Sequence, residues 1–463
     1  MKKKLSFIEA LGIIVLILAL IFVCLFIFKV PPHIPILGSV IFLGFFGFIK
    51  GIKWKELEKG IIEGISLGIK PILILSLVGV LISVWMMSGT IPTILYFGFD
   101  FLSPHYFLVS SLFITVLIST FTGSTFTTVS TVGVALMGVS SVMGVDPALA
   151  AGAIISGAAF GDKMSPLSDT TNFAAGIVEV DMFTHIRHMM WTTVPSLLLS
   201  SVLFLVLGLQ GNAADNLDYE QIAAVKEVLS NEFTLSLLTL ISPLIVLFLS
   251  IRRKDVVPTL IIGILTAFIT TVLVQPQFAI GEVLLALQDG VSIDSGNKIV
   301  DGIVNRGGLQ SMMSSVSLVM IALSLGGLMK TVGVITAFLE GIISFIKRSG
   351  DVIFSTALAS IGVNLITGEQ YLSVLLPGQT FKPLYNRYGL ENKNLARTLE
   401  DAGTLVNPLI PWGVSGAFIS QVLGVSVQTY VPWSFFLLFC PLFSIIFAYT
   451  GIGVAKKSSK ERN

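Results

Sequence analysis

Residues 161–172 interrupt an apolar region with the sequence Gly161-Asp162-Lys163-Met164-Ser165-Pro166-Leu167-Ser168-Asp169-Thr170-Thr171-Asn172. Apolar segments flank this stretch on both sides, and from Gly64 to Gly161 only Lys70, Asp100 and Asp146 carry charge. Proline prevents a regular helix, so backbone carbonyl groups here are free to face a ligand. Carboxylates at membrane depth are costly and are usually kept for a function. The stretch therefore predicts a broken membrane helix with a functional role.

The composition as a whole is that of a membrane protein. Of the 463 residues, 54% are hydrophobic and 12% are charged, which is about half the charged share of a soluble domain. Apolar segments long enough to cross a bilayer recur throughout the chain, which indicates a polytopic protein. A net charge of +1 provides no basic face, so no nucleic-acid partner is expected. Cys24 and Cys440 lie in apolar runs and are interpreted as packing residues.

Basic and acidic segments alternate along the chain, and basic loops mark the cytoplasmic side. The apolar run from Ile8 to Phe28 follows Lys2-Lys3-Lys4, and no small-residue cleavage site follows it, so it predicts a spanning helix rather than a signal peptide. The acidic stretches 210–232 and 288–306 are expected outside. The segments expected inside are the N-terminus, Lys50 to Lys59, Arg252-Arg253-Lys254, Lys347-Arg348, and the tail with Lys456, Lys457, Lys460 and Arg462.

The two halves of the sequence share short motifs in the same order. The matches are Pro35-Ile-Leu-Gly with Pro258-Thr-Leu-Ile, Phe121-Thr122-Gly123 with Ile366-Thr367-Gly368, and Ser165-Pro166-Leu167 with Asn407-Pro408-Leu409. Their offsets are 223, 245 and 242 residues, and the acidic insertion near 288–306 accounts for the first jump. The first half starts inside and ends outside, whereas the second does the reverse, so the repeats are predicted to be inverted. Inverted repeats with a site at their interface are typical of secondary transporters.

Each half has two polar breaks. The first break is residues 119–133, in which nine of fifteen residues are Ser or Thr, and its counterpart is residues 364–370 with Glu369. The second break is residues 161–172, and its counterpart is residues 400–412. Carboxylate, hydroxyl, amide and unwound carbonyl oxygens suit a small hard cation such as Na⁺, which takes about five or six of them. Burial favours the protonated carboxyl group, so one carboxylate can exchange a proton for a cation.

The candidate ion- or substrate-binding residues share these four breaks. Asp162, Asp169 and Asp401 are the Na⁺ candidates, and Glu369 is a further titratable group. The full set is Thr122, Gly123, Ser124, Thr125, Asp162, Ser165, Asp169, Thr170, Thr171, Asn172, Thr367, Gly368, Glu369, Glu400, Asp401, Thr404 and Asn407.

Other interpretations of the same residues remain open. The breaks could be surface loops with ordinary Ser-Pro and Asn-Pro turns. Lys163 could neutralise Asp162 or Asp169, and Arg397 could do the same for Glu400 or Asp401. Asp181, His185 and His188 have a spacing that a metal site could use, although an interfacial helix is favoured. The sequence has no G-x-x-x-x-G-K-[ST] or H-E-x-x-H motif, so neither an ATP-driven pump nor an enzyme is expected, and no cofactor is expected.

The motif Gly161–Asn172 resembles the NhaC family of sodium/proton antiporters. The segment Arg397-Thr-Leu-Glu-Asp-Ala-Gly-Thr404, followed by Pro408-Leu-Ile-Pro-Trp412, is similar to the same family, and the resemblance covers essentially the whole chain. It implies an inverted-repeat carrier of the ion transporter superfamily, built as a scaffold-plus-transport-domain dimer with elevator-like motion. Some relatives exchange organic anions such as malate and lactate. The sequence departs from the family pattern at Gly413-Val414-Ser415, where an Asn-Thr-like pair is expected.

Together these observations predict an all-α polytopic membrane protein with two inverted-topology repeats, broken helices, re-entrant hairpins and roughly 10–12 transmembrane segments. The predicted boundaries are a cytoplasmic N-terminus 1–7, a first repeat 8–208, an acidic external linker 209–232, a second repeat 233–450 and a basic cytoplasmic tail 451–463. The predicted function is Na⁺/H⁺ antiport across a bacterial cytoplasmic membrane, with both termini inside. The alternatives are a Na⁺- or H⁺-coupled carrier of a small carboxylate or amino acid, a passive channel, and a membrane sensor.

Overall fold

The structure is a computed structural model that describes residues 5–101, 103–210 and 219–457. Within these ranges the secondary structure is helical, apart from one antiparallel bridge between Leu390 and Lys456. The all-α prediction is therefore confirmed. The charges predicted to orient the chain at Lys2-Lys3-Lys4, Lys460 and Arg462, and residues 211–218 of the acidic stretch 210–232, lie outside the described residues.

The first half begins with the apolar run predicted from Ile8 to Phe28, which forms α1 and a π-helical turn. Its α-helices are α1 (Phe7–Phe22), α2 (His33–Ile49), α3 (Trp54–Ser66), α4 (Ile69–Met87), α5 (Thr90–Phe101), α6 (Phe107–Thr122), α7 (Thr125–Thr128), α8 (Val134–Val142), α9 (Pro147–Met164), α10 (Asp169–Val178) and α11 (Met182–Gln210). The π-helices η1 (Val23–Ile27) and η3 (Val129–Gly133) and the 3₁₀-helix η2 (Pro104–Tyr106) connect them.

The linking helix α12 (Tyr219–Glu232) precedes the second half. The helices that follow are α13 (Ile241–Ile251), α14 (Val256–Val274), α15 (Ile280–Asp289), α16 (Lys298–Val304), α17 (Met313–Val332), α18 (Val334–Ile343), α19 (Ser349–Thr367), α20 (Gln370–Arg387), α21 (Asn392–Leu399), α22 (Val414–Leu423), α23 (Val427–Tyr430) and α24 (Phe435–Thr450). The π-helix η6 (Glu400–Thr404) extends α21, and the 3₁₀-helices are η4 (Leu237–Leu240), η5 (Gln310–Met312), η7 (Asn407–Leu409) and η8 (Val431–Trp433).

Several of these helices are long and apolar enough to cross a membrane. The described residues contain 8 such helices, or up to 10 when each of two sharply bent pairs counts as one span. One bent pair joins α12 to η4 and α13 at 88°, and the other joins α22 to α23 and η8 at 89°. The upper figure of 10 equals the lower end of the predicted range of 10–12. Shorter apolar helices, among them α2 and α24, are not included in either figure.

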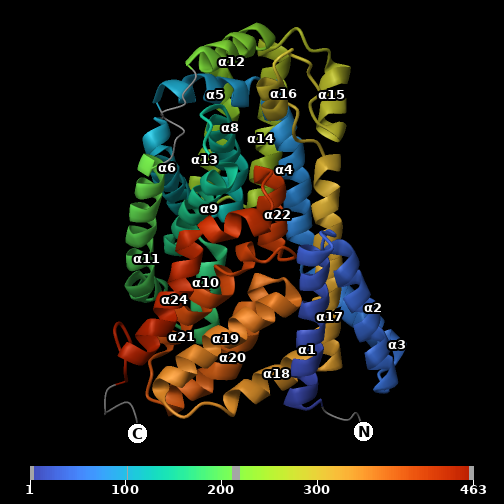
Figure 1. Ribbon diagram of the computed structural model, residues 1–463, viewed down its shortest axis with the longest axis vertical. Coiled ribbons are helices and arrows are strands. Elements are labelled where there is room, and N and C mark those ends of the chain that lie inside the picture. The colour runs from blue at the N-terminus through green and yellow to red at the C-terminus, as the bar shows by residue number, and fades with distance from the viewer. Residues whose placement is uncertain (1–4, 102, 211–218, 458–463) are drawn as a thin grey trace.

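Charged segments gather at opposite ends of the molecule (Figure 1). The acidic linker helix α12 and the short α16 lie at one end. The start of α1, the turn between α2 and α3, and the α18–α19 connection lie at the other, and Lys50 pairs there with Glu9 at 2.8 Å between Nζ and Oε1. These segments of opposite charge therefore lie at two ends of one bundle, whereas Arg253 and Lys254, also predicted inside, line a cavity with Asp162.

The helices of the two halves follow each other at a constant spacing. The starts of α7 and α20, of α9 and α21, and of α10 and α22 are each 245 residues apart. Gly123 and Gly368 are also 245 apart, and both have left-handed backbone, with φ of 65° and 66°. The equal spacing is compatible with the predicted duplication. It also corrects one match: Asp162, not Ser165, lies 245 residues before Asn407, so the two Pro-Leu motifs are not equivalent.

Candidate functional site

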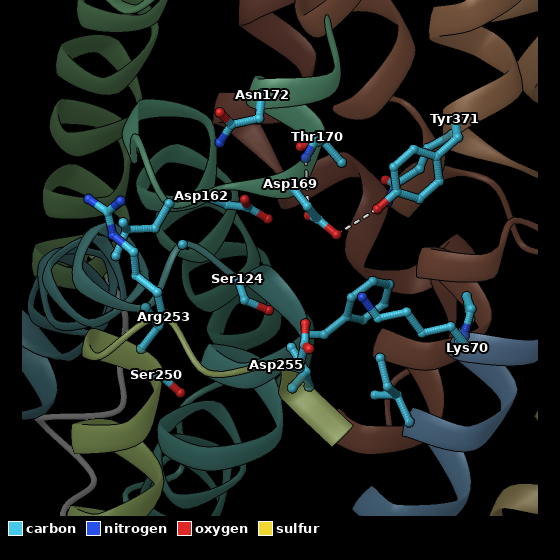
Figure 2. A pocket seen from close by; sticks show the side chains of 18 of the residues that line it. Lys70, Ser124, Asp162, Asp169, Thr170, Asn172, Ser250, Arg253, Asp255 and Tyr371 are labelled. Atoms are coloured by element: carbon cyan, nitrogen blue, oxygen red, sulfur yellow. Dashed lines mark hydrogen bonds between the residues drawn. The ribbon is translucent and has the colours of Figure 1, made fainter. Parts of the chain in front are cut away.

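The breaks meet around two neighbouring cavities. The larger has a volume of about 450 Å³, and we call it the vestibule; its wall includes Ser124, Asp162, Asp169, Glu369 and Tyr371. Figure 2 shows Asp162 and Asp169 turned toward this cavity, with Lys70 and Arg253 on opposite sides of it in that view. The smaller has a volume of about 30 Å³, and we call it the chamber. Phe126, Asp162, Thr170 and Gln370 line both cavities, so the chamber adjoins the vestibule.

The first break contains the start of helix α7, which the side chain of Asp162, from the last turn of α9, contacts. Helix α6 ends at the left-handed Gly123, and the side chain of Ser124 then caps α7 by accepting a hydrogen bond from the Thr127 backbone N–H at 3.2 Å. Thr125, the first residue of α7, donates from its N–H at 2.9 Å and its hydroxyl at 2.8 Å to Oδ2 of Asp162. In the described ranges, the other carboxylate oxygen, Oδ1, is buried and accepts no hydrogen bond.

The second carboxylate of the chamber comes from the π-helix η6. Glu400 is fully buried and lines the chamber with Thr404, whose hydroxyl donates to Glu400 Oε2 at 2.8 Å. Among the described residues, Oε1 of Glu400 has no hydrogen-bond partner. A π-turn often marks a functional site, because the extra residue changes which side chains share a helix face. The chamber therefore has two carboxylates, each with one uncommitted oxygen.

Lys163 lines the chamber and forms an ion pair there with Asp401, which does not line it. Its Nζ lies 2.7 Å from Oδ1 of Asp401, and both side chains are buried. Thr192 at 3.1 Å and Cys440 at 3.0 Å donate to the same oxygen. The hypothesis that Lys163 neutralises Asp162 or Asp169 is therefore wrong, because Asp401 of the second half is its partner.

Arg397 also differs from its predicted role. It donates from Nη1 to the Gly453 carbonyl at 2.7 Å, and no ion pair with Glu400 or Asp401 is present in the part of the chain that the structure describes.

The remaining candidates divide by location. Asp169 accepts a hydrogen bond from the Tyr371 hydroxyl at 2.6 Å on the vestibule wall (Figure 2), and Glu369 accepts one from the Leu372 N–H at 2.7 Å as the cap of α20. The candidates that line the vestibule or chamber are Thr122, Gly123, Ser124, Thr125, Asp162, Asp169, Thr170, Asn172, Glu369, Glu400 and Thr404. Those that line neither are Ser165, Thr171, Thr367, Gly368, Asp401 and Asn407.

The residues Asp181, His185 and His188 do not come together as a metal site. Backbone and side-chain hydrogen bonds from Thr184 hold the pKa of Asp181 below its ordinary value, since the carboxylate caps α11. His188 contacts Asn394 Oδ1 through Nε2 at 3.1 Å. No cluster of three or more metal-ligating side chains occurs within the residues that the structure describes. Residues Met182–Gln210 form one continuous helix, α11, that is long and apolar enough to cross a membrane, and His185 and His188 lie buried near its start.

Sequence reasoning missed four groups on the cavity walls. Gln370 lines both cavities, and Tyr371, Lys70 and Arg253 line the vestibule. The sequence contains a signal for two of these four residues. Gln370 lies 245 residues after Thr125, and Lys70 is an isolated charge in an apolar segment. Ser415, in the segment that departs from the family pattern, lines the chamber and donates its N–H to Asn407 Oδ1 at 2.7 Å.

Gly123 is required by both its backbone conformation and its close packing. A Cβ at this position would lie 2.7 Å from the carbonyl carbon of Leu167, and φ is already 65°. We expect Gly123→Ala to destabilise the protein by more than ~2 kcal/mol, because strain and overlap add. Gly144→Ala is the matched control, since φ is 67° there with nothing within 4 Å, and about 1 kcal/mol is expected. Thermal unfolding in detergent measures both; equal losses would contradict the packing argument.

Helices broken at membrane depth around a partly polar cavity define a membrane transporter of the secondary type. The Na⁺/H⁺ antiporter family matches residues 157–452. The chain is 52% identical to the Na⁺/H⁺ antiporter NhaC of Alkalihalophilus pseudofirmus over 99% of both chains, and 48% identical to NhaC of Bacillus subtilis over 98% of this chain and 99% of that one. The chain therefore belongs to the NhaC family of Na⁺/H⁺ antiporters. It is a multi-pass membrane transporter and not an enzyme, and transport of this kind needs no cofactor.

More distant relatives carry other names. The arginine/ornithine antiporter ArcD of Halobacterium salinarum is 33% identical over 99% of this chain and 95% of its own length. The malate-2H⁺/Na⁺-lactate antiporter of Bacillus subtilis is 31% identical over 95% of this chain and 94% of its own length.

Proposed function

We propose that the protein exchanges Na⁺ for H⁺, and that the chamber is where the two ions compete. The observation that carries this proposal is that Asp162 and Glu400, which both line a cavity of about 30 Å³, each have one buried oxygen without a hydrogen-bond partner among the described residues, Oδ1 and Oε1. A cavity of this size holds about one water-sized ligand. Buried carboxylates need a compensating charge or hydrogen bond, and either a proton or a small cation supplies it.

Competition for the same oxygens couples the two ions. A protonated carboxyl group cannot ligate Na⁺ through the oxygen that carries the proton. Binding of Na⁺ therefore releases a proton, and binding of a proton releases Na⁺. Thr404 and Thr125 contribute hydroxyl groups beside the carboxylates, and Asp169 and Glu369 line the approach through the vestibule. Lys163 also lines the chamber, and its pairing with Asp401 neutralises the ammonium group there, so that Asp401 supports the site without lining it.

The test uses purified protein in lipid vesicles with an internal pH dye. Addition of Na⁺ to vesicles that hold a pH gradient is expected to dissipate the gradient, because Na⁺ and H⁺ exchange on one site. Choline at the same ionic strength serves as the control and should have no effect. Proton movement that does not depend on Na⁺, beside clear uptake of an organic acid, would contradict the proposal.

A carrier of a small organic ion is the second candidate, and the vestibule favours it. Its volume of about 450 Å³ far exceeds that of a sodium ion, and Lys70, Arg253 and Lys254 on its wall could attract a carboxylate. Relatives named for arginine/ornithine and for malate and lactate exchange support it further. Labelled malate, lactate and arginine in the same vesicles distinguish the candidates.

The membrane topology completes the proposal. Two inverted repeats, 8–208 and 233–450, flank the external linker 209–232, with the N-terminal residues 1–7 and the tail 451–463 in the cytoplasm of a bacterial cell. The gathering of basic segments at one end (Figure 1) supports this orientation. A homodimer with elevator-like motion follows from the family resemblance, and cross-linking in native membranes tests the dimer.

A further inference from the structure

The two halves make equivalent contacts at the spacing of 245 residues. In the first half, the Ser119 hydroxyl donates to the Ala158 carbonyl at 2.6 Å; in the second, Asn364 Nδ2 donates to the Gly403 carbonyl. The caps correspond too: Ser124 accepts from the Thr127 N–H, and Glu369 accepts from the Leu372 N–H.

The close approaches at the two glycines repeat as well. A Cβ at Gly123 would meet Leu167, and a Cβ at Gly368 would meet Trp412. Each half therefore folds its two breaks together in the same way.

Asp162 and Asn407 occupy equivalent positions in this arrangement, yet their hydrogen bonding differs. Asp162 keeps Oδ1 without a partner among the described residues. Asn407 is fully buried and engaged at both ends. Its Nδ2 donates to Asn364 Oδ1 at 2.7 Å and to the Gly368 carbonyl at 3.0 Å, and its Oδ1 accepts from the Ser415 N–H at 2.7 Å.

The amide nitrogen of Asn407 thus lies between two oxygen acceptors, the kind of surroundings that a small cation also prefers. An NH₂ group satisfies both acceptors without adding charge. A carboxylate at the same position would face these two acceptors with no donor, and only a proton or a cation could relieve the repulsion.

We propose that Asn407 confines cation binding to the site at Asp162: its amide closes the equivalent position in the second half. This inference rests on the proposed function, since it takes Asp162 as an ion ligand. Asn407 is then a positioning residue that keeps the transporter at one cation site per chain. The link from Asn407 through Asn364 to the carbonyl of Gly403 also holds η6, from which Glu400 reaches the chamber.

The experiment counts Na⁺ ions bound to purified protein with ²²Na⁺ and measures the rise in Tm that Na⁺ produces. Asn407→Asp is expected to raise the bound ions from about one to about two per chain, and to increase the Na⁺-dependent rise in Tm by at least about 2 °C. The double variant D162N/N407D is expected to bind about one ion, because the carboxylate has moved from position 162 to position 407. D162N alone is expected to bind almost none.

Two further variants separate charge from packing. Asn386→Asp makes the same substitution at an exposed position of α20 and should bind no additional Na⁺. Asn407→Ser removes the amide without adding charge, and should lower Tm while leaving the count of bound ions as in the unaltered protein.

The outcomes are distinguishable. The inference is overturned when N407D binds no more Na⁺ than N386D, when D162N/N407D shows no response to Na⁺, or when N407S keeps its full Tm. If folded N407D protein can be purified only in the presence of Na⁺, the inference is supported, since the cation would then replace the amide. Absence of Na⁺ binding to the unaltered protein would instead contradict the proposed function.

Discussion

Asp162→Asn is expected to lower Na⁺-driven proton movement by at least about 100-fold while the protein stays folded. The asparagine can still accept both hydrogen bonds from Thr125 through its carbonyl oxygen, so the contact between α9 and α7 is kept. The chamber, however, loses a negative charge and its titratable group. Loss of a charged partner at a buried site costs about 3 kcal/mol, which is roughly 100-fold in affinity. The vesicle assay with the pH dye measures the effect.

Asp146→Asn is the matched control, because it makes the same substitution at the other end of the same helix. Asp146 is exposed and caps α9 by accepting hydrogen bonds from the N–H groups of Ala148 and Leu149. Asparagine caps helices about as well as aspartate, so stability and transport should stay near those of the unaltered protein. Full Na⁺-dependent activity in D162N, or equal losses in the two variants, would show that the cation does not depend on Asp162.

The sequence predicted the polar breaks and the broad fold because both follow from local composition. A proline or glycine next to hydroxyl and acidic residues within an apolar run cannot continue as a buried helix, so the break near 161–172 was visible directly. The Thr-Gly pairs at 122–123 and 367–368 gave the correct spacing, because both glycines end a helix in left-handed backbone. The Pro-Leu pairs misled by three residues, because the proline that lies 245 residues after Pro166 is Pro411 and not Pro408.

Partners across the two halves could not be predicted from either half alone. Lys163 and Asp401 are 238 residues apart, and nothing near Lys163 in the sequence distinguishes Asp401 from the adjacent Asp162. The geometry resolves the choice, since Thr125 already holds Asp162 from the opposite side. The chamber could not be predicted as a unit either, because both halves of the chain line it. Only the structure shows that Glu400 lines it while the adjacent Asp401 pairs with Lys163.

Lys163→Met is expected to destabilise the protein by about 3–5 kcal/mol. Asp401 is fully buried, and without the ammonium group only Thr192 and Cys440 would donate to its carboxylate. Methionine has a similar length and fills the space of the aliphatic stem, so the loss reports on charge rather than on a cavity. Thermal unfolding in detergent, with a fold-sensitive probe, measures the change. Lys382→Met is the control, because Lys382 pairs at 3.1 Å with Glu179, whose side chain is 80% exposed, and less than about 1 kcal/mol is expected.

The double variant K163M/D401L distinguishes two roles of the buried Lys163–Asp401 pair, stabilisation of the fold and ligation of the cation. Replacement of a buried ion pair by apolar residues of similar volume is often neutral for stability, so most of the loss in K163M should be recovered. If the pair only supports the fold, Na⁺/H⁺ exchange should return together with stability. If Asp401 itself ligates the cation, stability should return while exchange stays low. The position of Asp401 outside the chamber wall favours the first outcome, because Asp162 and Glu400 keep their uncommitted oxygens in the double variant.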